Sequence, residues 1–194
     1  QLSRSKNNGL IKIITGLRRS GKSFLLKKLF HQHLLDEGVR EDHILVIDME
    51  SRKNREFKNP DYLLDWVEKM MIDYETYYII IDEVQEVEGW ERAVNSLLED
   101  ANTDIYVTGS NSKLMSSEIS TYLTGRYISI PVFTLSFAEY LEFKKGSNRT
   151  TKELLNEYIR TGGFPIVALG NFDERSSYQI VEGIYNSVIT GDIA

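Results

Sequence analysis

A glycine-rich segment near the N-terminus has the residue types and the spacing that bind phosphate. Residues 16–23 read Gly-Leu-Arg-Arg-Ser-Gly-Lys-Ser and fit the Walker A pattern G-x-x-x-x-G-K-[ST]. Gly16 and Gly21 allow a tight turn and a close approach of the backbone to phosphate. The amides from Arg19 to Ser23 lie where a helix is predicted to begin, and the helix dipole favours an anion there. The segment predicts a nucleotide-binding loop with contacts from Gly16, Arg19, Ser20, Gly21, Lys22, Ser23 and Phe24.

Two side chains of this loop and two acids further along predict the chemistry. Lys22 is expected to reach the β- and γ-phosphates, and the Ser23 hydroxyl to ligate Mg²⁺. Asp82 and Glu83 follow the apolar run 77–81, at the end of a strand, where open α/β sheets bind ligands. We expect Asp82, as a Walker B acid, to hold Mg²⁺ through water. Glu83 is expected to activate the water that attacks the γ-phosphate.

Polar residues after a later strand and an arginine before the last strand are further candidates. Ser110 and Asn111 follow the apolar run 104–108, beside the expected acidic pair. One of them is expected to sense the γ-phosphate, although either could instead cap the helix that follows. Arg126 precedes the run 127–132. It fits an arginine finger, and it also fits an ordinary surface arginine.

The elements that must position these residues follow from hydrophobic patterning. Short apolar, β-branched runs predict strands, and apolar residues at helical spacing predict helices. The predicted strands are 10–15, 43–49, 77–83, 104–108 and 127–132. The predicted helices cover 24–34, 61–71 with Asp61 as N-cap, 90–101, 137–143, 152–161 and 180–189. Strands alternating with helices predict an α/β domain over residues 1–135, followed by helices over 136–194.

Composition excludes several classes of protein. Hydrophobic residues make up 41% of the 194, enough for a core, and no apolar run approaches the ~18 residues of a membrane span. Without cysteine there are no disulfides, which fits a cytoplasmic location. The three histidines do not form a metal-ligand pattern. Residues 1–35 carry eight basic and no acidic side chains, while the rest is net −14. This basic segment suits the phosphates of a nucleotide, and no second basic stripe suggests nucleic acid.

Six short motifs, taken in order, are specific enough to suggest a family. They are residues 16–23, Asp82-Glu-Val-Gln85 with Trp90, Thr108-Gly-Ser110, Leu123-Thr-Gly-Arg126, Leu135-Ser-Phe-Ala-Glu-Tyr140 and Gly162-Gly-Phe-Pro165. Over residues 10–165 the chain resembles the AAA-type ATPases of bacteria and archaea that carry a C-terminal domain of unknown function. The resemblance implies a P-loop NTPase fold of the AAA+ (ASCE) type. In that fold a parallel five-stranded sheet of order 5-1-4-3-2 precedes a helical lid, here residues 136–194.

The resemblance also implies roles for individual residues. The first sensor would be Ser110 or Asn111, the arginine finger would be Arg126, and Pro165 would abut the adenine. No arginine of the lid clearly matches a second sensor, and the candidates are Arg160 and Arg175. The chain begins on Gln and ends directly after a helical pattern, so we expect a fragment trimmed at both ends. The family's C-terminal domain, with its unknown protein or nucleic-acid partner, would then be missing.

These features predict an ATPase that binds ATP or ADP with Mg²⁺. Hydrolysis would change the angle between core and lid, and Arg126 would act across a homo-oligomer. An alternative is a slow, nucleotide-gated switch or interaction module, which would keep the same Lys22, Asp82 and Glu83. A small-molecule kinase is less favoured, because neither a set of lid arginines nor an acceptor pocket is evident.

Overall fold

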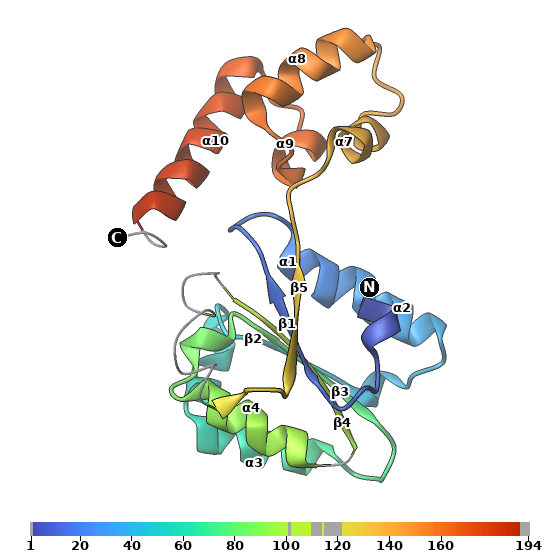
Figure 1. The fold of residues 1–194 in the computed structure, drawn as a ribbon, viewed down its shortest axis with the longest axis vertical. Coiled ribbons are helices and arrows are strands. Elements are labelled where there is room, and N and C mark those ends of the chain that lie inside the picture. Colours follow the sequence, from blue (N-terminus) through green and yellow to red (C-terminus); the bar gives the residue numbers. More distant parts are fainter. Residues whose placement is uncertain (1, 101, 110–113, 115–121, 191–194) are drawn as a thin grey trace. The chain divides into compact units, whose positions relative to one another are not determined.

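The structure is a computed structural model, and it describes residues 2–100, 102–109, 114 and 122–190. It divides into two compact units, each described here by itself. The sheet unit comprises residues 1–15 and 22–131, and the helical unit comprises residues 16–21 and 132–194 (Figure 1). The glycine-rich loop is therefore grouped with the C-terminal helices, while Lys22 and Ser23 are grouped with the sheet.

The sheet unit is built on five parallel strands. They are β1 (Ile11–Thr15), β2 (Ile44–Asp48), β3 (Tyr77–Asp82), β4 (Thr103–Thr108) and β5 (Tyr127–Pro131). Their order in space is β2-β3-β4-β1-β5, and all neighbours run parallel. This order confirms the predicted 5-1-4-3-2. The predicted strands differ from the observed ones by no more than one residue at either end.

Parallel pairing brings the carboxyl ends of neighbouring strands to one edge of the sheet. Asp48 at the end of β2 pairs in register with Asp82 at the end of β3. On the other side, Ile14 of β1 pairs with Thr108 of β4. All six residues of β3 are buried, as expected for an apolar strand covered on both faces. The sequence thus places its acids and hydroxyls at the edge where ligands bind in such sheets.

Helices cover both faces of this sheet (Figure 1). On one face α1 (Lys22–Phe24), the π-helical turn η2 (Leu25–Phe30) and α2 (His31–Asp36) run on as one helical segment. On the other face α3 (Pro60–Met70) and α4 (Trp90–Glu99) pack side chains such as Leu63 and Trp90 into the core. The short 3₁₀ helices are η1 (Leu2–Ser5), η3 (Glu41–His43), η4 (Arg52–Lys58) and η5 (Val84–Glu86).

The start of α3 corrects one prediction. The N-cap is Asn59 and not Asp61, because the Asn59 side chain accepts hydrogen bonds from the backbone amides of Asp61 (2.9 Å) and Tyr62 (3.4 Å). Pro60 takes the first helical position, where its missing N–H costs nothing. The predicted cap was two residues too late, because Asn-Pro is itself a helix start.

The helical unit contains α7 (Phe137–Phe143), α8 (Thr151–Thr161), α9 (Pro165–Leu169) and α10 (Glu174–Val188). Two of these helices begin with a capping box, Ser136 with Glu139 and Thr150 with Glu153. The short α9 was not predicted, because its five residues follow a glycine pair that reads as a loop. A side chain on Gly163 would overlap the carbonyl oxygen of Leu135, so this turn requires glycine.

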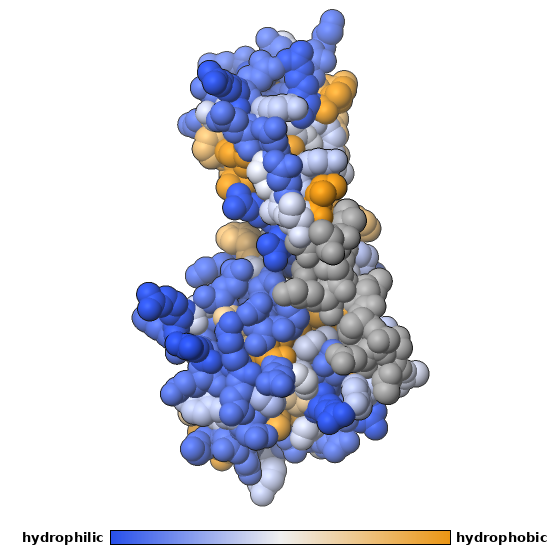
Figure 2. All heavy atoms as spheres, turned by 90° about the vertical axis from the view of Figure 1, so that its left-hand side faces the viewer, coloured by the Kyte–Doolittle hydropathy of each residue, from blue (hydrophilic) through white to orange (hydrophobic). Residues whose placement is uncertain are grey.

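The surface is mostly polar on the face drawn in Figure 2, with separate apolar patches over the helical unit. Exposed apolar side chains of that unit include Ile159 and Leu169, which are 71% and 68% exposed. Among the described residues no helix combines the length and the apolar character needed to cross a bilayer.

Candidate nucleotide site

The glycine-rich loop has the backbone geometry that its sequence predicts. A side chain on Gly16 (φ 147°) would overlap the carbonyl oxygen of Val132, so only glycine fits there. Arg19 adopts the left-handed conformation at φ 62°, and Gly21 has φ 103°. The Ser20 amide donates to the carbonyl of Leu17 at 3.2 Å. This sharp turn leads directly into the first turn of α1.

One observation on this loop fits a bound phosphate group, and a second concerns the expected adenine contact. The Ser20 hydroxyl is buried, yet it has no hydrogen-bond partner among the described residues. Buried polar atoms normally have one, so a further partner is expected there. Pro165 lies beside the loop, since a side chain on Gly21 would come within 3.7 Å of the proline ring. The adenine-contacting role of Pro165 stays a prediction, but the residue is near the loop.

The sheet unit brings the hydroxyl of Ser23 to the carboxylate of Asp82. The Ser23 Oγ donates to Asp82 Oδ1 at 3.0 Å, although the two residues are 59 apart in sequence. Lys22, one residue before, is 5% exposed. Hydroxyl and carboxylate oxygens are the ligands that Mg²⁺ prefers. Ser23 and Asp82, the two predicted metal ligands, therefore fit this ion.

Two side chains without a predicted role hold Asp82 in place. Thr108, at the end of β4, donates its hydroxyl to Asp82 Oδ1 at 2.5 Å. The Lys27 ammonium lies 2.7 Å from Asp82 Oδ2. Asp82 is 1% exposed, so these contacts offset the free energy of burying its charge. Thr108 belongs to the motif Thr108-Gly-Ser110, but the sequence alone did not predict that its hydroxyl would contact Asp82.

Glu83 follows Asp82 in an unusual backbone conformation. Its φ of 58° and ψ of 53° are left-handed, which costs a residue with a side chain about 1–3 kcal/mol. Its amide donates to the Thr108 hydroxyl at 3.0 Å, which fixes the turn. Its carboxylate accepts from Gln85 Nε2 at 2.5 Å. A side chain on Gly109 would overlap the Gln85 amide oxygen, so the glycine after β4 leaves room for Gln85.

The carboxyl edge of β2 and β3 carries a concentration of negative charge. Burial raises the pKa of Glu50, and the charges of Glu83, Asp48 and Asp82 raise it further. Burial would also raise the pKa of Asp48, but the hydrogen bond from Lys27 outweighs this and the pKa lies below its usual range. For Lys27, burial lowers the pKa, and the hydrogen bonds to Asp48 and Asp82 more than compensate. This edge favours cations.

Of the remaining predicted site residues, the structure describes Arg126 and Phe24. Ser110 and Asn111 lie outside the described residues. Arg126 lies at the opposite, amino edge of the sheet, since its carbonyl accepts from the amide of Ile11, the first residue of β1. Its guanidinium is 2.5 Å from Asn95 Oδ1 and 3.5 Å from Glu99 Oε1, both on α4. Phe24 is 61% exposed on α1.

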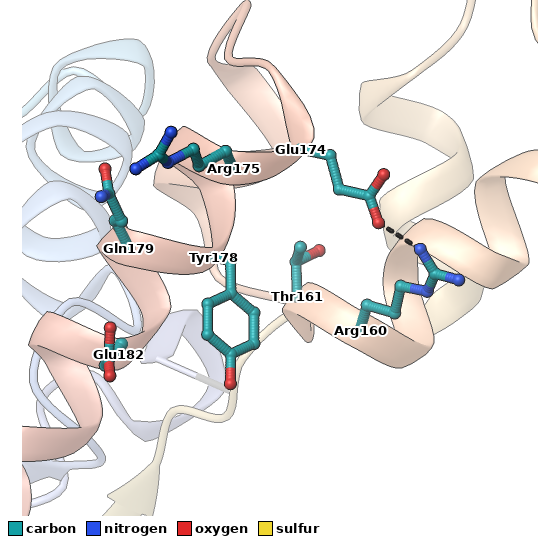
Figure 3. Close-up of a pocket in the computed structure, with 7 residues that line it drawn as sticks. All are labelled: Arg160, Thr161, Glu174, Arg175, Tyr178, Gln179 and Glu182. Carbon is teal, nitrogen blue, oxygen red and sulfur yellow. Dashed lines mark hydrogen bonds and ion pairs between the residues drawn. The ribbon is translucent and has the colours of Figure 1, made fainter.

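The two second-sensor candidates line a pocket within the helical unit (Figure 3). The pocket has a volume of about 730 Å³ and lies between α8 and α10. Arg160 forms an ion pair with Glu174, and Figure 3 shows Arg175 pointing in a different direction. Both arginines line this pocket, so the geometry does not decide which of them would be the second sensor.

A parallel sheet of this order, with a glycine-rich loop after β1 and an acidic pair at the end of β3, defines a P-loop NTPase core of the AAA+ type. The chain belongs to the AAA domain family, whose model matches residues 8–141. Membership supports a nucleotide-binding function of the ATPase type.

Relatives and solved structures agree with this assignment. An uncharacterized protein of Haemophilus influenzae is 40% identical over 100% of this chain and 48% of its own length. The uncharacterized protein MJ1544 of Methanocaldococcus jannaschii is 31% identical over 94% of this chain and 42% of its own. The structure of C. elegans PCH-2 superposes with a TM-score of 0.55 at 14% identity, covering 93% of this chain and 61% of that one, which supports the fold. The chain spans about half the length of the Haemophilus influenzae protein and of MJ1544.

Proposed function

We propose that this chain binds ATP with Mg²⁺ and hydrolyses it to ADP and phosphate. The observation that carries the proposal is the contact of the Ser23 hydroxyl with Asp82 at 3.0 Å, with Glu83 next in the chain. A predicted phosphate-loop hydroxyl and a predicted metal-binding acid, far apart in sequence, meet at one edge of the sheet. Such a meeting is expected of a Mg·nucleotide site.

Each residue has a defined part in the proposed reaction. A bound Mg²⁺ ion would supply positive charge that offsets the negative charge of the nucleotide phosphates. Ser23 and Asp82 would hold it, and the Lys22 ammonium would contact the same phosphates. Glu83 would take a proton from the water whose oxygen attacks the γ-phosphorus, while the bond to the β–γ bridging oxygen breaks. The products are ADP and inorganic phosphate.

One contact within the helical unit could transmit a change at the nucleotide to its helices. Gly21 of the loop and Pro165 at the start of α9 lie against each other within that unit. A change in the loop on hydrolysis would therefore reach α9 through this contact. We propose that α7 to α10 serve as the lid whose movement is coupled to hydrolysis.

Two variants test the proposal. Glu83→Gln should still be stabilised thermally by Mg·ATP, because ligand that binds only the folded state adds RT ln(1 + [L]/Kd). Its phosphate release should fall by about 10²–10⁴-fold, the usual contribution of a general base. Lys22→Ala should lose the thermal shift itself, while Lys28→Ala, which removes an exposed lysine of the same helical segment, should keep both. An unchanged shift in Lys22→Ala would contradict the phosphate-loop assignment, and wild-type turnover in Glu83→Gln would assign the base elsewhere.

A slow nucleotide-gated switch is the second candidate, and one contact favours it. The Glu83 carboxylate accepts a hydrogen bond from Gln85 Nε2 at 2.5 Å, which would compete with a water for the same oxygen. Gln85→Ala would free this oxygen. Faster phosphate release in Gln85→Ala at unchanged ATP affinity would support the switch.

A further inference from the structure

Lys27, which has no role in the proposed reaction, lies at the candidate site. Its ammonium is 2.7 Å from Asp82 Oδ2 and 2.8 Å from Asp48 Oδ2. The lysine side chain is 25% exposed, and Asp82 is nearly inaccessible. An ammonium bridging two carboxylates, one of them buried, makes stronger contacts than a surface ion pair.

The fold explains why one lysine reaches both acids. Lys27 is four residues after Ser23, so both side chains lie on the same face of the helical segment. Asp48 and Asp82 are register partners at the ends of β2 and β3, which places their carboxylates side by side. The helix that presents the Ser23 hydroxyl to Asp82 therefore presents an ammonium to the same edge one turn later.

The ammonium occupies a place that would suit a divalent ion. Asp82 Oδ1 receives the hydroxyls of Ser23 and Thr108, and Asp82 Oδ2 faces Lys27. Without the lysine, Asp48 and Asp82 would form a bare pair of carboxylates, with Glu50 adding negative charge nearby. Paired carboxylates are sufficient to bind Mg²⁺ or Mn²⁺ weakly.

We propose that Lys27 is a positioning residue that keeps divalent metal from settling on Asp48 and Asp82 until the nucleotide phosphates bring it. The inference rests on the proposed function, because it assigns Asp82 to a Mg·nucleotide site. The ammonium lowers the charge of the carboxylate pair from −2 to −1 and holds Asp82 in place. The phosphates of ATP supply the negative charge that the free site lacks. Metal binding thereby depends on nucleotide.

The test measures Mn²⁺ binding to the nucleotide-free chain from the electron paramagnetic resonance signal of free Mn²⁺. The wild type should bind Mn²⁺ only weakly. Lys27→Met, which removes the charge but keeps the length, should lower the Mn²⁺ Kd by at least about tenfold. Lys27→Arg, which keeps the charge, should behave as the wild type. Adding Asp48→Asn to Lys27→Met should abolish the gain, because one of the two carboxylates is then neutral.

Matched controls make each outcome decisive. Lys28→Met removes the neighbouring, exposed lysine and should leave the Mn²⁺ Kd unchanged. An equal gain in Lys28→Met, or no gain in folded Lys27→Met, overturns the inference. If Lys27→Met does not fold, Lys27→Gln takes its place, and tight Mn²⁺ binding by the wild type overturns the inference without any variant.

A separate measurement distinguishes failure of this inference from failure of the proposed function. ADP binding to each variant is followed by calorimetry in EDTA, where no divalent metal is available. If ADP binds and Lys27→Met gains no Mn²⁺ affinity, only the role of Lys27 is wrong. If ADP binds to none of the chains, the proposed function fails, whatever the Mn²⁺ titrations show.

Discussion

At the scale of single residues, the candidate site depends on side chains that hold other side chains. Asp82 would meet the metal, yet its position is set by Thr108 and Lys27. Thr108 also receives the amide of Glu83, so one hydroxyl orients both acids. Substitutions at such supporting residues should therefore change metal and water positioning without touching the nucleotide.

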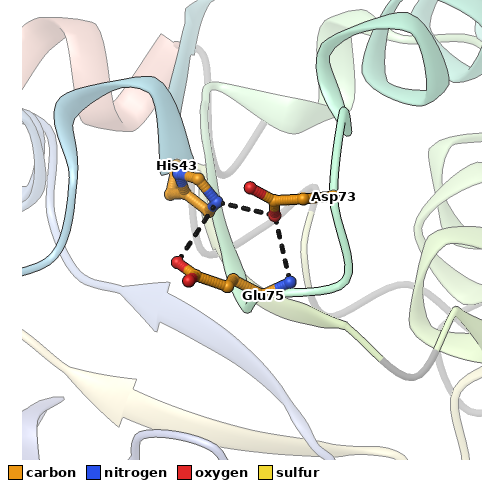
Figure 4. A group of neighbouring side chains, drawn as sticks. All are labelled: His43, Asp73 and Glu75. Carbon is orange, nitrogen blue, oxygen red and sulfur yellow. Dashed lines mark hydrogen bonds and ion pairs between the residues drawn. The ribbon is translucent and has the colours of Figure 1, made fainter.

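A second group of charged residues surrounds His43 at the amino edge of the sheet (Figure 4). Its ring nitrogens lie 2.9 Å from Asp42 and 2.9 Å from Asp73, with Glu75 at 3.7 Å. The ring is 2% exposed and stacks on Tyr77 at 4.3 Å. Burial alone would lower the pKa of His43, but the hydrogen bonds to Asp73 and Asp42 outweigh it, so the pKa is raised. Arg40, paired with Asp42 and Asp73, opposes this rise.

This raised pKa predicts a pH dependence of stability. The imidazolium stabilises the folded state below the unfolded pKa of about 6.5, and this contribution is lost as the pH rises through the raised folded pKa. In urea unfolding, the wild type should therefore be more stable than His43→Gln at pH 6, by about 1–2 kcal/mol, with a smaller difference at pH 9.

The half-exposed pair of His33 and Glu37 offers the control, since His33→Gln should change stability little at either pH. His43, Asp73 and Glu75 also place three potential ligand atoms within 4.8 Å of one another. Both series are therefore run with EDTA. If the wild type is stabilised only when Zn²⁺ is added, and its free energy of unfolding does not depend on pH, the three residues form a metal site and not an ionic cluster.

At the scale of elements, the start of α3 offers a direct comparison of two residues. Asn59→Ala should lower the free energy of unfolding by about 1 kcal/mol, because it removes the cap that satisfies two amides. Asp61→Ala should cost only about 0.3 kcal/mol, since it removes an acid from the first turn and no capping bond. Urea unfolding of both variants measures this. If Asp61→Ala lowers the free energy of unfolding more than Asn59→Ala does, Asp61 is the N-cap, as the sequence suggested.

The strands were predictable from sequence because each is a short run rich in apolar and β-branched residues. The phosphate loop, Asp82 and Glu83 were predictable because their spacing is constrained by chemistry. Lys27 was not, since its meaning depends on Asp48, 21 residues away, being in register with Asp82. His43 likewise acquires its role only when the chain brings Asp73 beside it, 30 residues later. Contacts between distant, common residues leave no local pattern.

At the scale of the whole molecule, Arg126 raises the question of assembly. It lies at the edge of the sheet away from Asp82 and is held by Asn95 and Glu99. If it is an arginine finger, it must serve a neighbouring subunit. Specific ATPase activity should then rise with protein concentration, and Arg126→Ala should lower the activity of the assembled state by about 10³–10⁵-fold while sparing ATP affinity.

Mixing variants tests whether the site is shared. Arg126→Ala and Glu83→Gln subunits should be nearly inactive alone and should recover activity together, because each supplies what the other lacks. Arg4→Ala, which removes another exposed arginine of the sheet unit, serves as control. Activity that is independent of concentration, with no recovery in the mixture, would make Arg126 a structural partner of α4.

At position 83 the left-handed backbone favours one residue type, and the proposed chemistry requires another. The turn itself would be satisfied by glycine, which adopts φ near 58° without strain, whereas the proposed chemistry requires a carboxylate. Retention of glutamate therefore works against folding, and replacement by glycine would relax the turn as it removes the base. In a relative that binds nucleotide without hydrolysing it, glycine at this position would be compatible with the fold. Position 83 is thus where a relative that had become a pure nucleotide sensor would be expected to diverge first.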